Sequence, residues 1–317
     1  MKKIIVVLLL LVISSSIVYG CDVCGCKLGG LYYGILPQYN SHFVGVRYSH
    51  ASFNASITYD SEYLEDEYSH DTYQRVDLYG RYVFHPKFQM YAIVPYLRNQ
   101  MDGSHQDVTE SGVGDPMVLL YYNPFNTGDE VTNDWKHSLL LGAGVKLPLG
   151  DFESEDNGEL INRNFQLGSG SLDYLISMNY TLRFNNLGLN IESSYKYNTA
   201  NKYEYKFGNQ LNSSVYLFYY FQTPQISFLP YTGIYFESAE KHLDGKVEQP
   251  NTGGSATFCS LGTQVLRNNF TLAFQYQAPI SQNYNSDEIS EIKTGNRFMI
   301  NLLYNFSMKD KSKLLTE

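Results

Sequence analysis

Three cysteines near the N-terminus are the first residues of this 317-residue chain whose types and spacing suit chemistry. Cys21, Cys24 and Cys26 follow a Cys-x-x-Cys-x-Cys pattern, and three thiolates at that spacing can hold a soft metal such as Cu(I) or Zn(II). In an oxidising compartment, a local disulfide with one spare thiol competes with this metal site. Acylation of Cys21 as a lipoprotein anchor is a third alternative, which the bulky Tyr19 disfavours.

Ten charged residues form a second candidate group, because each lies on the polar side of a segment in which apolar and polar residues alternate. If these segments are membrane strands, a charge facing lipid costs about 2–4 kcal/mol near the bilayer midplane, so the ten side chains must face the lumen. There they either fill a small barrel as a salt-bridge network or line a pore for a small polar or anionic solute. The expected pore-lining residues are Arg47, Arg75, Asp77, Arg81, Lys146, Asp173, Arg183, Glu192, Lys196 and Arg297.

The segment before the cysteines, residues 1–20, has the pattern of a signal peptide. Lys2 and Lys3 precede an apolar run that ends at Ile13, and small polar residues follow it. A spanning helix needs about 20 apolar residues, so this run is too short for an anchor, and no later stretch reaches that length. We therefore expect export, a periplasmic cysteine-containing segment over 21–41, and membrane crossing by strands alone.

Two-residue alternation predicts these strands. From Leu172 to Phe184, one parity is apolar throughout, whereas the other holds polar residues such as Asp173. Such segments run for about 10 to 13 residues, which is longer than typical soluble strands and close to the length of a tilted transmembrane strand. Aromatic residues such as Tyr304 and Phe306 gather at the segment ends, as they do in the interfacial girdles of outer-membrane barrels.

We therefore expect an all-β fold, a transmembrane antiparallel up-and-down β-barrel of about 12 strands over 42–308, followed by a periplasmic tail over 309–317. Short turns alternate with long polar stretches, of which 54–71, 100–110 and 281–295 are examples, and this asymmetry is typical of outer-membrane barrels. An even number of strands places both termini in the periplasm. The expected strands are 42–50, 73–84, 88–98, 112–122, 136–148, 171–184, 187–197, 209–221, 226–238, 254–266, 269–279 and 296–307.

Three motifs carry a resemblance to a known family. They are Gly-Val-Gly-Asp-Pro at 112–116, Gly-Ala-Gly-Val-Lys-Leu-Pro-Leu-Gly-Asp at 142–151 and Gly-Ser-Gly-Ser-Leu-Asp at 168–173. With them, the chain resembles, over about residues 110 to 310, the outer-membrane transporter family named after the meta-pathway of phenol degradation. The resemblance implies a transporter or porin-like barrel. Leu149 stands where threonine is commoner in that family, which does not affect the fold that the resemblance implies.

The N-terminus of the mature chain carries a second resemblance. Its Cys-Asp-Val-Cys-Gly-Cys start at 21–26 is similar to the start of uncharacterised exported barrels from Bacteroidetes-type bacteria. This likeness indicates an origin and implies no function.

Composition narrows the function classes. At 43% hydrophobic and 17% charged residues, the chain is not intrinsically disordered. The net charge of −9 and the lack of internal basic runs argue against a nucleic-acid partner. No phosphate-binding glycine loop, zinc-protease helix, dinucleotide motif or partnered Ser and His pattern occurs, so we do not expect an enzyme.

Two hypotheses follow from the sequence. The first is an outer-membrane transporter or porin-like channel for a small solute, a monomer whose other partners are membrane lipid and lipopolysaccharide. The second is a barrel-anchored periplasmic protein that binds copper or zinc through the cysteine cluster. No other cofactor is expected.

Overall fold

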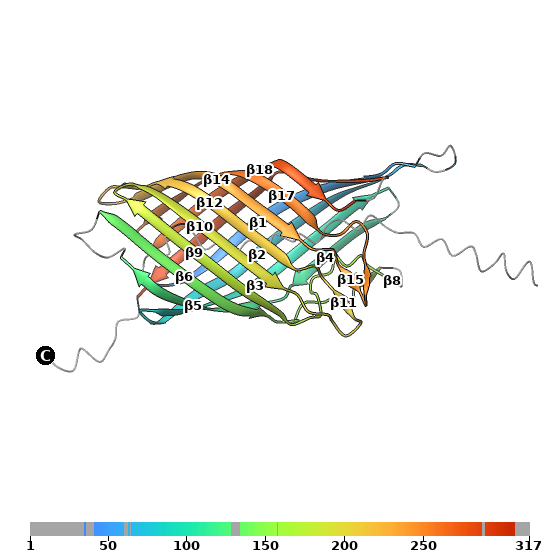
Figure 1. Ribbon diagram of the computed structural model, residues 1–317, viewed down its shortest axis with the longest axis horizontal. Coiled ribbons are helices and arrows are strands. Elements are labelled where there is room, and N and C mark those ends of the chain that lie inside the picture. The colour runs from blue at the N-terminus through green and yellow to red at the C-terminus, as the bar shows by residue number, and fades with distance from the viewer. Residues whose placement is uncertain are drawn as a thin grey trace, which may run out of the picture.

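The fold is a closed antiparallel barrel of twelve strands, and the all-β barrel expected from the sequence is confirmed (Figure 1). The computed structural model describes residues 35, 41–59, 63, 65–104, 106–127, 134–156, 158–286 and 289–307. Each barrel strand pairs with its neighbours in sequence, and the first strand pairs with the last. The barrel strands are β1 (His42–Ile57), β2 (Glu67–His85), β3 (Phe88–Gly103), β5 (Met117–Asn126), β6 (Trp135–Lys146), β9 (Asp173–Phe184), β10 (Leu187–Tyr197), β12 (Gln210–Tyr219), β14 (Ser227–Ala239), β17 (Gly254–Arg267), β18 (Phe270–Tyr284) and β20 (Arg297–Phe306).

The two ends of the barrel differ. We call one the short-turn end, because tight turns such as 86–87, 185–186 and 268–269 join strands there, and β1 begins and β20 ends at it. At the opposite, long-loop end, short strands cap the barrel (Figure 1). Among the described residues, no helix is long and apolar enough to cross a membrane. The short strands are β4 (Asp107–Val113), β7 (Glu155–Asp156), β8 (Glu159–Leu160), β11 (Tyr205–Lys206), β15 (Leu243–Asp244), β16 (Val247–Glu248) and β19 (Ser290–Thr294) at the long-loop end, and β13 (Phe221–Gln222) at the short-turn end.

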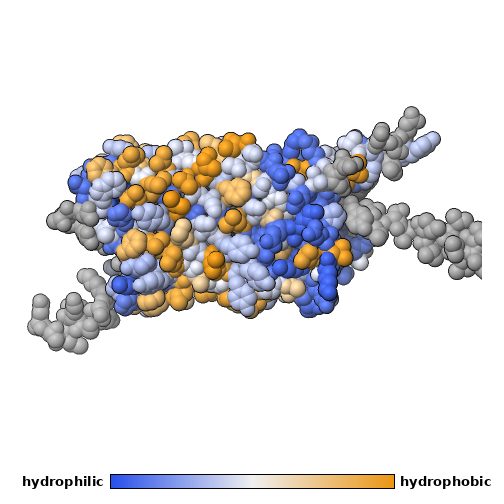
Figure 2. Space-filling view, in the orientation of Figure 1, coloured by the Kyte–Doolittle hydropathy of each residue, from blue (hydrophilic) through white to orange (hydrophobic). Residues whose placement is uncertain are grey.

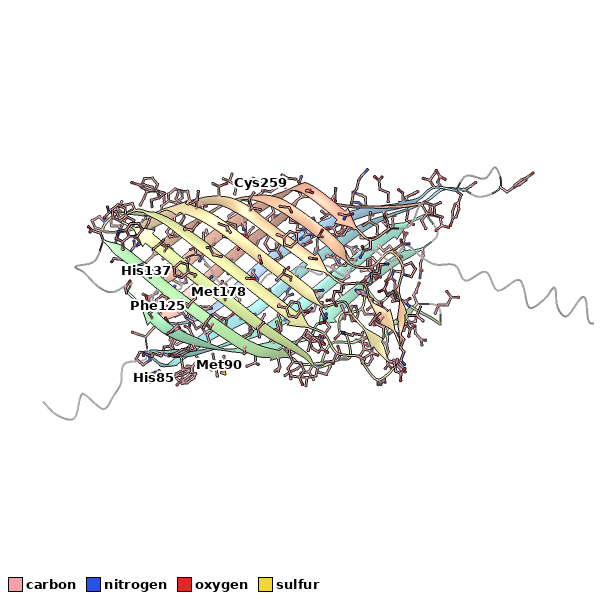
Figure 3. All side chains as sticks on the ribbon, in the orientation of Figure 1. His85, Met90, Phe125, His137, Met178 and Cys259 are labelled. Atoms are coloured by element: carbon pink, nitrogen blue, oxygen red, sulfur yellow. The ribbon has the colours of Figure 1, made fainter. Side chains whose placement is uncertain are left out.

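The outer wall is apolar, as the alternation requires. Val44, Leu78 and Ile176 expose 50%, 60% and 59% of their surface, although they lie within strands of the barrel. Apolar side chains cover the wall toward the short-turn end, whereas hydrophilic ones gather at the long-loop end (Figure 2). Met178 and Cys259 lie on this wall and point away from the barrel (Figure 3). A wall of this kind is stable only when lipid covers it.

The strands near the long-loop end extend beyond the ranges expected from the sequence. Residues 54–71, 100–110 and 281–295 were expected to be loops, but β1, β2, β3 and β18 continue into them, β4 begins in the second of them and β19 lies within the third. In β1 the polarity of the two faces inverts past His50, because Phe53 and Ile57 point inward and are buried while Asn54 points outward and is exposed. The outer face therefore changes from lipid-like to water-like along a single strand.

The expected strand 112–122 is also interrupted. β4 pairs with the half of β3 at the long-loop end, and β5 pairs with the half at the short-turn end. Residues 114–116 separate β4 from β5. Pro116 lacks a backbone N–H, so it cannot donate to the ladder, which explains why the pairing breaks at this position.

Three apolar layers fill parts of the lumen. The outer layer lies at the long-loop end and is built around Phe53, Tyr73, Phe165 and Phe258. Two inner layers lie toward the short-turn end, one around Tyr91 and Tyr121 and the other around Tyr216, Phe218 and Tyr231. Arg47, Arg75 and Asp77 lie between the outer layer and the inner layers, whereas other polar lumen residues, such as Arg81, lie toward the short-turn end.

A charge on the outer wall tests which surface meets lipid. We expect Met178→Arg to lower the free energy of unfolding in lipid bilayers by about 2–4 kcal/mol, because Met178 lies on the outward face near the middle of β9. Leu160→Arg is the matched control, since Leu160 is exposed in β8 outside the barrel wall and should change stability little. Urea titrations of both variants in vesicles measure the difference. Equal stability of the two variants would show that lipid does not cover this wall.

Candidate functional site

A buried charge cluster occupies the middle of the lumen. Arg47 on β1 and Asp77 on β2 are direct cross-strand partners, and Nε and Nη2 of Arg47 donate to Oδ2 of Asp77 at 2.8 and 2.6 Å. Nε of Arg75 donates to the other oxygen of Asp77 at 2.6 Å. The side chain of Asp77 is fully buried, and burial of a carboxylate is tolerated only with such partners. One carboxylate thus holds two guanidinium groups inside the barrel.

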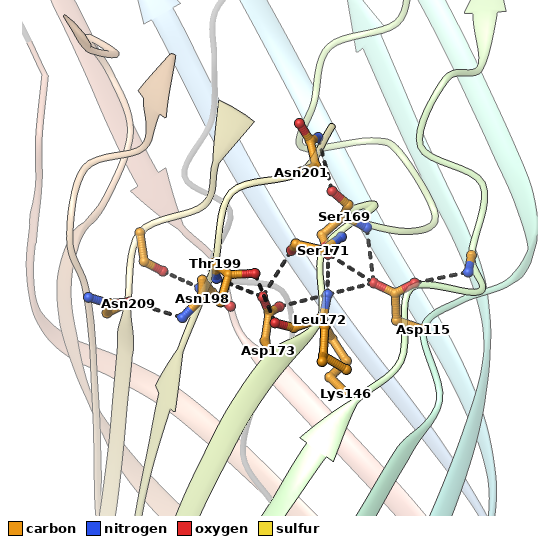
Figure 4. A network of polar contacts seen from close by, with 12 residues as sticks. Asp115, Lys146, Ser169, Ser171, Leu172, Asp173, Asn198, Thr199, Asn201 and Asn209 are labelled. Carbon is orange, nitrogen blue, oxygen red and sulfur yellow. Dashed lines mark hydrogen bonds and ion pairs between the residues drawn. The ribbon is translucent and has the colours of Figure 1, made fainter. Parts of the chain in front are cut away.

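A second cluster joins three segments of the wall to a loop of the long-loop end (Figure 4). Nζ of Lys146 lies 2.6 Å from Asp115 and 2.7 Å from Asp173, and it also contacts the hydroxyl of Ser169. The carboxylate of Asp115 accepts hydrogen bonds from the backbone N–H groups of Gly150 and Ser169, both at 2.9 Å. We call Asp115, Lys146, Ser169 and Asp173 the loop anchor, because they fix both ends of the segment 151–168.

The three family-like motifs meet in this loop anchor. Asp115, Lys146 and Asp173 come from the first, second and third motif respectively. Two glycines let the backbones approach, because a Cβ on Gly150 would lie 2.9 Å from the Cα of Gly168, and one on Gly168 would lie 2.3 Å from the carbonyl oxygen of Gly150. The spacing of these motifs therefore serves a single polar network, which the sequence alone did not place in one site.

The anchored segment plugs the lumen at the long-loop end. Phe165 is fully buried and stacks on Tyr73, with ring centroids 5.5 Å apart. Nδ2 of Asn99 donates to the carbonyl oxygen of Phe165 at 2.9 Å, which fixes the backbone of the segment against β3. The outer apolar layer therefore closes this end of the barrel.

A third charged pair crosses the lumen near that layer. Nη1 and Nη2 of Arg297 donate to the two carboxylate oxygens of Glu237 at 2.7 and 2.8 Å, although β20 and β14 are not neighbouring strands. The guanidinium carbon of Arg297 lies 4.2 Å from the ring centroid of Phe258. This bidentate pair joins two wall strands that β17 and β18 separate.

Two of the expected lumen residues lie toward the short-turn end. Arg81 donates from Nε to the carbonyl oxygen of Ser41 at 2.9 Å, and Arg183 lies over the ring of Tyr220 with its guanidinium carbon 4.9 Å from the centroid. Ile35, which precedes the first strand, is fully buried in the inner apolar layer that contains Tyr220. Its carbonyl oxygen accepts a hydrogen bond from the hydroxyl of Thr181 at 3.4 Å. The lumen is therefore also obstructed between the charge cluster and the short-turn end.

Three cavities lie among the described residues of the barrel interior and are lettered from A to C. Cavity A, about 70 Å³, is lined by Arg47, Arg75, Glu192 and Arg297 among others, and cavity B, about 100 Å³, by Lys146, Asp173 and Lys196 among others. Cavity C, about 470 Å³, lies at the short-turn end, where Arg81 lines it. Cavities A and B lie between the outer layer and the inner layers, since Tyr73 and Tyr235 of the outer layer and Tyr216 and Leu175 of the inner layers line them.

The structure thus places all ten expected residues on the inward face of their strands, in separate groups. Arg47, Arg75 and Asp77 meet in one cluster, and Lys146 meets Asp173 in another. Arg297 pairs with a residue that was not expected, and Arg81 and Arg183 lie apart from both clusters. Glu192 and Lys196 share the inward face of β10.

Four important lumen residues were missed. Glu237 lies on the inward parity of an expected strand, so the rule that found the other charges would have found it. Asp71 was assigned to a solvated acidic loop, but it is fully buried in β2 and contacts Ser69, because the alternation continues to Ser69. Asp115 was noted only as part of a motif. Nothing in the local pattern around Ile35 indicates that it enters the lumen.

The cysteine cluster lies outside the described residues, as do the segments assigned to the signal peptide and the C-terminal tail. In the part of the chain that the structure describes, no group of three or more His, Cys, Asp or Glu side chains is placed to hold a metal ion.

The loop anchor makes a testable contribution to stability. We expect Lys146→Met to lower the free energy of unfolding by about 3–5 kcal/mol, because it leaves the carboxylates of Asp115 and Asp173 buried without their cation. The segment 151–168 should also become sensitive to protease. Urea unfolding and limited proteolysis measure the two effects.

Lys202→Met is the matched control for that substitution. Lys202 pairs with Glu153 on the surface of the long-loop end, where the side chains are 58% and 39% exposed. The hydrogen bond from Lys202 lowers the pKa of Glu153, but an exposed pair contributes little to stability. If Lys146→Met and Lys202→Met behave alike, the anchor does not hold the loop.

Comparison with known proteins places the fold. A scan against protein-family models and a search of curated proteins each gave no match. Among solved structures, the chain is similar to an outer membrane channel from Pseudomonas putida F1, with a TM-score of 0.62 and 12% identity over 84% of this chain and 95% of that one. Weaker likenesses are to the beta domain of the Bordetella autotransporter BrkA (TM-score 0.47, 9% identity, 84% of this chain and 99% of that one) and to the CymD monoaromatic hydrocarbon channel (TM-score 0.42, 9% identity, 92% and 99%). The first of these likenesses establishes that the chain has the fold of an outer-membrane barrel.

Proposed function

We propose that this protein is a gated outer-membrane channel that moves a small solute through a charged lumen. The observation that carries the proposal is that cavities A and B lie between two obstructions, the plug around Phe165 and the inner layer that holds Ile35. A barrel that only supports other parts needs no polar cavities in its lumen. The cavities mark where a solute would rest when either obstruction moves.

The ten inward charges suit such a path. A lumen filled only by salt bridges would pair each charge locally, whereas Arg47, Arg75, Glu192 and Lys196 also line cavities. In this proposal the three paired clusters hold the wall and the plug in place, and the residues that line cavities contact the solute. The chain then acts without enzymatic chemistry.

The orientation of the barrel follows the general asymmetry of outer-membrane proteins. We propose that the short-turn end faces the periplasm and that the long-loop end faces outward, in contact with lipopolysaccharide. Both chain termini would then be periplasmic, because β1 begins and β20 ends at the short-turn end. A single chain closes the barrel, which supports a monomer.

We also propose that the chain is related to the transporter family named after the meta-pathway of phenol degradation. The support is that the three motifs of that resemblance meet in the loop anchor and build one network.

Opening the plug tests the channel directly. We expect Phe165→Ala to raise the conductance in planar bilayers and the rate of liposome swelling above those of the unmodified protein, because Phe165 fills the lumen at the long-loop end. Phe270→Ala is the control, since Phe270 is 53% exposed on the outer wall and its removal opens no path. Folding of both variants is checked by circular dichroism.

Two results would argue against a channel. One is an unchanged conductance in a folded Phe165→Ala variant. The other is an equal rise in conductance with Phe270→Ala, which would indicate a general leak. In either case the lumen would be a packed interior rather than a path.

A metal-binding role for the cysteine cluster is a second proposal, favoured by the Cys-x-x-Cys-x-Cys spacing. We expect the purified protein to bind Cu(I) or Zn(II) and a Cys24→Ser, Cys26→Ser double variant to bind neither, because a single thiolate makes a weak site. Metal content after dialysis, compared with the number of free thiols, measures this. Equal metal in both proteins, or two oxidised cysteines in the purified protein, would exclude the site.

A further inference from the structure

Cavity B has an excess of positive charge on its wall. Both carboxylates that line it, Asp115 and Asp173, bind Lys146. Two further carboxylates line the neighbouring cavity A: Asp77 holds Arg47 and Arg75, and Glu192 shares that cavity with them. Asp77, Asp115 and Asp173 are therefore already paired, and among the described residues one cation of the wall of cavity B remains without a paired carboxylate. The cations that line the cavity are Arg47, Arg75, Lys146 and Lys196.

Lys196 is that remaining cation. It lies on the inward face of β10 and is half-buried. In the described part of the chain, no carboxylate oxygen lies within 4 Å of its Nζ. An ammonium group withdrawn from water needs an anion or strong acceptors to offset its lost hydration. Arg75 and Lys146 line the same cavity, and the two carboxylates of its wall, Asp115 and Asp173, already bind Lys146.

The rest of the cavity wall combines apolar side chains with amide and hydroxyl groups, such as those of Asn198, Gln210 and Ser194. Leu97, Met117 and Leu175 line one part of it, and the rings of Tyr73 and Phe207 line another. A cavity of about 100 Å³ holds a few water molecules or one compact group, and it is too small for a long acyl chain. Cavity B therefore offers a cation, several polar groups and an apolar surface to a single ligand.

We infer that cavity B binds a compact monocarboxylate, with the carboxylate on Lys196 and a small apolar body against Leu97, Met117 and Phe207. This inference deepens the proposed channel function by naming its substrate class, and it rests on that function only for the route by which the ligand arrives. A carboxylate supplies the anion that Lys196 lacks, and the apolar body displaces water from the chamber. A neutral molecule of the same shape satisfies only the second requirement.

Equilibrium dialysis with radiolabelled benzoate tests the inference on the purified protein in detergent. We expect benzoate to bind, Lys196→Met to weaken the binding about tenfold or more, and Lys196→Arg to restore most of it, because the lost interaction is a charge-assisted hydrogen bond. Benzyl alcohol, which has the same ring without the charge, should bind weakly and equally to the protein and to Lys196→Met. Lys202→Met, which removes an exposed cation that does not line the cavity, should bind benzoate like the unmodified protein.

Three outcomes would overturn the inference. They are equal benzoate binding by the unmodified protein and a folded Lys196→Met variant, no benzoate binding by the unmodified protein, and benzyl alcohol binding as tight as benzoate. The channel proposal fails separately, because it is measured as conductance and swelling. Benzoate binding without conductance in Phe165→Ala would leave a binding site in a barrel that does not transport, whereas conductance without benzoate binding would leave a channel for another solute.

Discussion

Hydrocarbon offers no partner for a backbone N–H or C=O group, and the rest of this structure depends on that constraint. A sheet of twelve strands meets it only when β1 pairs with β20, and their register runs without a break from His42 opposite Phe306 to His50 opposite Phe298. Once the ring is closed, the parity of a residue along its strand determines the surroundings of its side chain. Those of one parity meet lipid, and those of the other share a lumen whose width the number of strands sets.

The lumen must then accept every charge that the strands carry. The chain meets this requirement with small, closed groups, in which Asp77 binds two arginines, Lys146 binds two aspartates and Glu237 binds Arg297. Each group also joins parts of the chain that are far apart in sequence. The polar interior therefore fixes the loops and braces the wall, and the apolar layers at its two ends keep it from bulk water. Cavities A and B lie among these charges, whereas cavity C lies at the short-turn end.

Most of the barrel was predictable from the sequence, because alternation is a local pattern. Within each strand, the apolar parity identifies the face that meets lipid. The ends of the strands at the long-loop end were not predictable. The expected strands stop where the outward-facing residues become polar, but β1 continues to Ile57 with its apolar residues turned inward. The inward parity of Lys146 and Asp173 was predictable, but their contact was not. Lys146 and Asp173 are direct cross-strand partners of β6 and β9, and no local pattern in the sequence fixes the register of two strands that a long loop separates. Nor does any local pattern show that Ile35 enters the lumen.

The inversion of polarity within β1 has a mechanical consequence. The seven residues from Ala51 to Ile57 extend the strand by about 20 Å beyond the apolar wall, somewhat less along the axis of a tilted barrel. The Phe165 plug packs inside this extension, so it lies beyond the depth at which acyl chains press on the protein. Its packing is then independent of lateral pressure and membrane thickness. A change in lipid composition would act on the wall, whereas ions and solutes in the surrounding water would act on the plug.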